Sequence, residues 1–93
     1  MKTTLTTDAI YRIEADLHAN ELTAQTLESE LDSLKDAAAA MRTSRAIQGL
    51  RSEGAAAMAP AIAIVEARVE AIRVELDELW RRHCELEELL ENN

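Results

Sequence analysis

Residues 58–90 read MAPAIAIVEARVEAIRVELDELWRRHCELEELL. Apolar residues recur in this stretch at alternating steps of four and three, which is the heptad spacing of a coiled-coil helix. We therefore expect one long helix here, with a seam that packs against another helix. The residues of this seam are Met58, Ile62, Val65, Val69, Ile72, Leu76, Leu79, His83, Leu86 and Leu90.

The first half of the chain carries a second seam with the same spacing. Thr6 is suited to cap a helix that starts near Thr7, because its side chain can accept a hydrogen bond from the first turn. The seam fades after Met41, so we expect a first helix over about 7–48. Its seam residues are Ile10, Ile13, Leu17, Asn20, Ala24, Leu27, Leu31, Leu34, Ala38 and Met41.

A turn is predicted between the two seams, over about 49–54, where two glycines bracket polar residues. The second helix is then expected over about 55–91. Pro60 leaves its start open, because proline lacks an N–H donor and is comfortable only in the first turn of a helix. Either the helix begins at Pro60, or it begins near Ser52 and bends at Pro60.

These elements predict an all-α fold: an antiparallel coiled-coil hairpin that forms a single domain over 1–93. The composition agrees, since the 93 residues include no Phe, two Gly and one Pro. The outline resembles two kinds of helical hairpin, the secreted proteins with a Trp-x-Gly turn and the Rop type, which dimerises into a four-helix bundle and binds RNA. The turn at 49–54 contains no tryptophan.

The register of the hairpin follows from the polar residues of the seams. If the numbers of facing residues sum to 103, Asn20 in one seam faces His83 in the other. We expect these two to hydrogen-bond and to fix the register, as a buried polar residue does in coiled coils. The same register places Glu28 near Arg73 and Lys35 near Glu66.

Both helices also carry uncharged residues on the face opposite the seam. A two-helix hairpin needs only one seam, so the surplus predicts contact with a second copy, giving a homodimeric four-helix bundle. The alternative is that small residues are merely tolerated on an exposed face. The larger residues of this candidate surface are Leu22, Ile47, Leu50, Ile64 and Val74.

A candidate surface for a protein partner lies near the end of the second helix. Trp80 is followed by Arg81 and Arg82, and tryptophan and arginine are enriched among binding hot spots. The alternatives are that Trp80 covers the edge of the seam and that the acidic end is a solvated face. The remaining members of this surface are Glu87, Glu88 and Leu89.

No motif for catalysis, cofactor binding or metal binding is found in the sequence, so no enzyme is expected. His83 and Cys84 are adjacent in a helix and point about 100 degrees apart, which does not assemble a metal site. Cys84 is the only cysteine and cannot form an intrachain disulfide. With no signal-peptide or membrane-spanning run, we expect a cytoplasmic protein.

The net charge of −8 disfavours direct binding to nucleic acid and favours a basic protein partner. We therefore expect a protein–protein interaction module of the adaptor or inhibitor type. The alternative is an acidic phage-type inhibitor, either anti-CRISPR-like or a nucleic-acid mimic, that blocks a nucleic-acid-binding protein.

Overall fold

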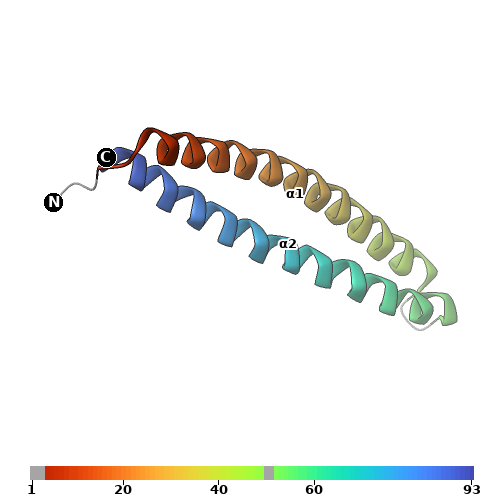
Figure 1. The fold of residues 1–93 in the computed structure, drawn as a ribbon. Coiled ribbons are helices and arrows are strands. Elements are labelled where there is room, and N and C mark those ends of the chain that lie inside the picture. The colour runs from red at the N-terminus through yellow and green to blue at the C-terminus, as the bar shows by residue number, and fades with distance from the viewer. Residues whose placement is uncertain (1–3, 50–51) are drawn as a thin grey trace.

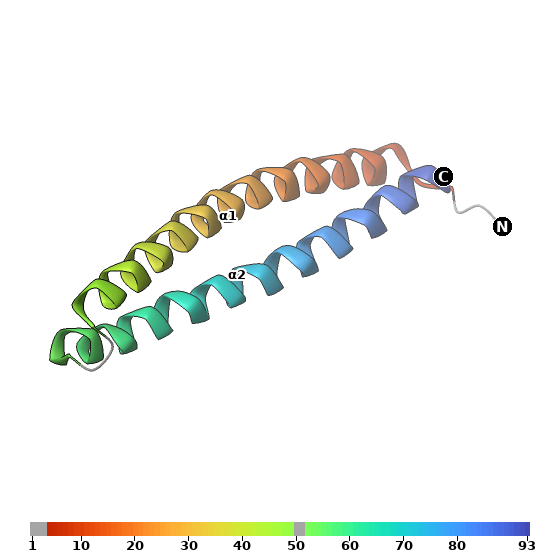
Figure 2. The same ribbon diagram turned by 180° about the vertical axis from the view of Figure 1, so that it is seen from behind.

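The structure is a computed structural model that describes residues 4–49 and 52–93. Helix α1 spans Thr7–Gln48 and helix α2 spans Glu53–Glu91. They lie side by side in opposite directions (Figures 1 and 2), in a molecule that measures 65 × 21 × 14 Å. The described residues contain no strand. The predicted all-α antiparallel hairpin is therefore confirmed.

Each helix begins at a side-chain cap. The Thr6 hydroxyl accepts a hydrogen bond from the N–H of Ala9 at 3.1 Å, and the Ser52 hydroxyl accepts one from the N–H of Ala55 at 3.1 Å. These bonds satisfy backbone donors that have no partner inside a helix. α1 ends at Gly49, whose φ of 87° is a conformation that residues with a side chain rarely adopt. Local chemistry thus sets three of the helix boundaries.

Pro60 lies inside α2 and does not begin it. The helix starts at Glu53, because Ser52 caps it there, and it continues through Pro60. The alternative start at Pro60 is therefore wrong. Since proline has no N–H, the carbonyl of Ala56 lacks its usual helical hydrogen bond, and the helix carries an unfavourable residue at this point.

The core is a thin strip between the helices. Every residue of the two predicted seams is buried or half-buried, and Ile72 is the only large side chain that is fully buried among the described residues. At the end of the hairpin opposite the turn, which we call the open end, a hydrogen bond joins the two ends of the chain: the N–H of Leu5 donates to Oδ1 of Asn93 at 2.6 Å. The buried residues are Ala24, Ala38, Ala55, Ile62, Val69, Ile72 and His83.

Ion pairs between the helices report the register. Arg42 pairs with Glu66 on one edge of the seam, and Arg68 Nε lies 3.0 Å from Glu30 Oε1 on the other edge. The residue numbers of these pairs sum to 108 and 98, which lie equally far above and below 103. A slip by one heptad would change both sums by seven and separate both pairs, so both pairs agree with the predicted register.

Candidate partner-binding surfaces

The hydrogen bond predicted between Asn20 and His83 is not formed. Nδ2 of Asn20 and Nδ1 of His83 are both buried, and neither has a hydrogen-bond partner. His83 instead directs Nε2 to its own helix, where it lies 3.2 Å from Oε1 of Glu87, one turn further on. His83 reaches the carboxylate of Glu87 without crossing to the other helix, and Nδ2 of Asn20 is therefore left without a partner. The two polar residues lie in their seams as predicted but do not bond to each other.

Trp80 is held against His83 at the edge of the seam. The ring centroids are 5.2 Å apart and the planes are 83° from parallel, which is the edge-to-face arrangement that aromatic rings favour. Trp80 nevertheless remains 41% exposed. An aromatic ring fixed by a buried neighbour and open to solvent is preorganised for binding, because little side-chain freedom is lost on association.

The charged residues near Trp80 fall into two groups on α2. Arg81 and Arg82 line one shallow hollow, whereas Glu87 and Glu88 line another beside Cys84. These two hollows lie at successive turns of α2. The first hollow is completed by Glu75, Glu78, Leu79 and Glu85, and the second by Glu91.

The edge of the seam that carries Trp80 is acidic towards the open end of the hairpin. Heptad arithmetic places two exposed aromatic or imidazole residues of α1, Tyr11 and His18, on the same edge, and no Lys or Arg occupies it there. Among the described residues, none of its carboxylates pairs with Lys or Arg. We call this surface the aromatic-acidic edge; its members are Tyr11, Glu14, His18, Glu21, Glu28, Asp77, Trp80, Cys84, Glu87 and Glu91.

Tyr11 belongs to this edge and was missed by the sequence reasoning. It is 68% exposed, and an outward heptad position next to a glutamate series is the signal that could have found it. Most of the large apolar residues predicted to lie on the candidate surfaces are exposed. Leu50 lies outside the described residues. The exposed ones are Leu22, Ile47, Ile64, Val74 and Leu89.

The opposite edge of the seam carries a compact charge network. Arg68 reaches Glu30 on α1, and its Nη1 lies 3.6 Å from Oε1 of Glu75 on α2. The hydrogen bond to Glu30, with the charge of that carboxylate, raises the pKa of Arg68 above its ordinary value. The charged Arg68 side chain therefore contributes to stability at neutral pH. This contribution is lost only when the pH rises far enough to deprotonate the guanidinium group.

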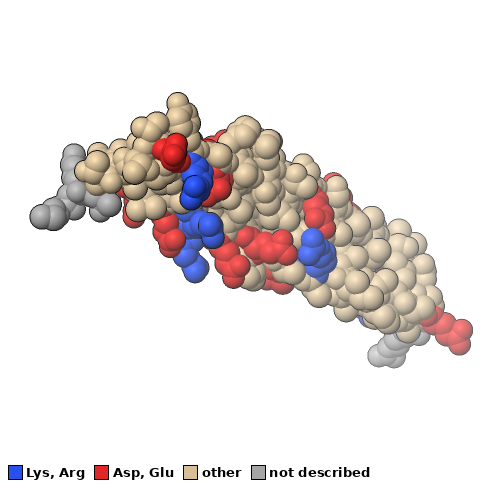
Figure 3. All heavy atoms as spheres, in the orientation of Figure 1, with Lys and Arg blue, Asp and Glu red and all other residues tan. Residues whose placement is uncertain are grey.

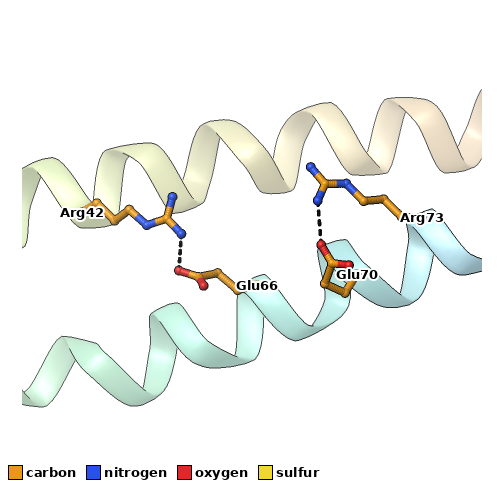
Figure 4. Close-up of polar contacts among 4 residues, drawn as sticks. All are labelled: Arg42, Glu66, Glu70 and Arg73. Carbon is orange, nitrogen blue, oxygen red and sulfur yellow. Dashed lines mark hydrogen bonds and ion pairs between the residues drawn. The ribbon is translucent and has the colours of Figure 1, made fainter.

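The edge that carries Trp80 has a different charge pattern near the turn. Arg42 reaches across to Glu66, while Arg73 Nη1 lies 2.6 Å from Oε1 of Glu70 on its own helix (Figure 4). Arg73 thus pairs with Glu70, and among the described residues no ion pair joins it to Glu28, which the predicted register places nearby. Lys35 lines the same hollow as Glu66, but Arg42 is the residue that pairs with that carboxylate. Long side chains reach several partners, so the register alone did not determine these pairs.

The remaining chemistry is sparse. Within residues 4–49 and 52–93, no group of three His, Cys, Asp or Glu side chains is placed to hold a metal ion. Cys84 is a free, exposed thiol. In the part of the chain that the structure describes, neither helix has an apolar run long enough to cross a membrane.

The chain matches no protein-family model, no curated protein and no solved structure. Its function is therefore inferred from the exposed side chains and their charges.

Proposed function

We propose that this chain is a self-associating, non-enzymatic protein-interaction module of the cytoplasm, of the adaptor or inhibitor type. The observation that carries the proposal is Trp80, which is fixed against buried His83 and yet exposed. The seam already has its partner helix, so the exposed ring is not needed to close the hairpin. Tryptophan is enriched among the residues that contribute most to binding, which cluster near the centre of interfaces.

The partner is expected to be basic. The aromatic-acidic edge combines Trp80 and Tyr11 with carboxylates that have no Lys or Arg partner in the described residues. Arginine and lysine side chains of a partner would pair with these carboxylates and stack on the aromatic rings. The net charge of −8 would also steer a basic protein towards the molecule.

The test compares two variants as bait for the same partner. Trp80→Ala removes the exposed ring from the aromatic-acidic edge, and Leu22→Ala removes an exposed apolar side chain elsewhere on α1. We expect the partner captured by the wild-type chain to bind Trp80→Ala at least about tenfold more weakly and to bind Leu22→Ala normally. Equal binding by both variants would contradict the assignment of this surface.

A second candidate function is that of an acidic inhibitor that mimics nucleic acid. It is favoured by the unpaired carboxylates of the same edge, which lie along both helices. Such an inhibitor would compete with duplex DNA or RNA for its target, and its affinity would fall steeply with salt. Binding that persists in high salt and is unaffected by added duplex would instead favour a hydrophobic interface around Trp80.

A further inference from the structure

We propose that the second copy binds on one face of the turn half of the hairpin, with the two turn halves side by side and the open ends pointing apart. The face is called the turn-half face. This inference rests on the self-association in the proposed function and names its surface. The residues that define the face are all exposed: Ala40, Ile47, Ala57, Ala61, Ile64 and Ala67.

Two large aliphatic side chains stand out on this face. Ile47 is 81% exposed and Ile64 is 71% exposed, although each is among the most hydrophobic residue types. Ile47 lies on α1 and Ile64 lies on α2. The heptad spacing places each of them on the same side of the seam as Arg68, but further out from the seam. The alanines around them allow another helix to approach closely. The face therefore combines two large apolar side chains with small alanines around them.

The surface area of the chain leaves room for an interface. A folded monomer of 10.3 kDa is expected to expose about 5,400 Å², whereas this chain exposes 6781 Å². The difference, about 1,400 Å², exceeds the roughly 800 Å² that each partner contributes to a standard interface. The radius of gyration of 20.5 Å likewise exceeds the roughly 12 Å expected for a compact chain of this length. One more layer of helices would bring both quantities towards ordinary values.

Charge decides which part of the surface a second copy can cover. Two copies of a chain with a net charge of −8 repel one another wherever unpaired carboxylates meet. On the face seen in Figure 3, the half that ends in the turn is almost free of charged atoms, whereas charged side chains gather along the middle and towards the open end. At the border of the turn-half face, Arg68 is already paired with Glu30 and Glu75. None of the residues that define this face is charged, so the face can approach its own copy without bringing its own carboxylates together.

The same argument sets the direction of the second copy. Parallel hairpins would bring the two acidic open ends together, and full antiparallel overlap would lay each acidic half on an apolar one. Overlap of the turn halves alone buries the apolar face and separates the acidic ends. With the two-fold axis at Ile64, the two Cys84 residues would lie about 60 Å apart, since each is twenty residues along the helix from the axis.

The first experiment measures the dimer dissociation constant by sedimentation, with helicity checked by circular dichroism. Ile64→Glu would place a carboxylate against its own copy, and we expect the dissociation constant to rise at least about 30-fold. Leu22→Glu makes the same change at an exposed apolar residue that belongs to the wider surface predicted from the sequence but lies outside the turn-half face, and we expect a change within about threefold. Loss of the dimer in the Leu22 variant with retention in the Ile64 variant would overturn the proposal.

The second experiment measures the distance between nitroxide labels on the native Cys84 thiols of the dimer. About 60 Å supports the overlap of turn halves, while about 35 Å would indicate full antiparallel overlap, and a shorter distance a parallel dimer. Either of the last two results overturns the arrangement. A wild-type chain that stays monomeric overturns self-association as a whole. Capture of a partner through Trp80 is measured separately and would survive that failure.

Discussion

Nε2 of His83 lies 3.2 Å from Oε1 of Glu87 on the same helix, and Nδ1 of the same ring is buried without a partner. Asn20, in the opposite seam, buries Nδ2 in the same unsatisfied way. Each seam therefore contains a polar group that loses its hydration and gains no hydrogen bond. Such groups are costly in a thin core.

Asn20→Leu is accordingly expected to stabilise the hairpin. The free energy of unfolding should rise by about 1–3 kcal/mol, because a half-buried amide whose Nδ2 is buried without a hydrogen-bond partner is replaced by an apolar side chain of similar size. Urea denaturation followed by circular dichroism measures the change. A loss of stability would show that the amide does hold His83 in solution.

Pro60→Ala is also expected to stabilise the chain. Alanine restores the hydrogen bond to the carbonyl of Ala56 and suits a helix interior, so the free energy of unfolding should rise by roughly 1–3 kcal/mol. Ala63→Pro is the matched control at another exposed position of α2 and should destabilise by about 3 kcal/mol or more. Thermal unfolding of the two variants decides the matter. If Pro60→Ala proved destabilising, the continuous helix through this residue would be in doubt.

The two glycines of the turn region should respond differently to alanine. Gly49 has a φ of 87°, so Gly49→Ala should cost about 1–3 kcal/mol of stability. Gly54 lies inside α2, where a methyl group would meet only the flexible end of the Gln48 side chain. Gly54→Ala should therefore be neutral or stabilising by up to about 1 kcal/mol. Equal effects in denaturant titrations would mean that α1 does not end at Gly49 in this conformation.

The ion pair between Arg42 and Glu66 is expected to contribute little, because both side chains are exposed. A double-mutant cycle with Arg42→Ala and Glu66→Ala should give a coupling free energy of about 0.2–1 kcal/mol that falls further in high salt. A salt-insensitive coupling well above this range would indicate that the pair is shielded from solvent, for example by a second copy.

The sequence was sufficient for the architecture, because its signals are local and repeated. Thr6 and Ser52 have the side chains that cap helices, and the seam positions recur at the heptad spacing for most of each helix. The start of the second helix was ambiguous because Ser52 can cap a helix while Pro60 disfavours its interior. In the structure Ser52 caps α2 through the N–H of Ala55, and the helix runs on through Pro60.

Side-chain partners were harder to predict than positions. Asn20 and His83 both occupy their predicted layers, yet His83 points to Glu87, since the orientation of a ring depends on all its neighbours. Arg42 reached Glu66 in place of Lys35, because both are long enough to do so. Tyr11 was overlooked since an outward position has no role in the seam.

The central claim is that the hairpin is a unit of a larger assembly, held by apolar faces that its own seam does not use. Absolute mass in solution, measured by light scattering over a wide range of concentrations at low and high salt, tests it most directly. We predict a mass twice the 10.3 kDa of the chain at both salt concentrations, because the turn-half face is uncharged. A mass of 10.3 kDa at every concentration would contradict the claim.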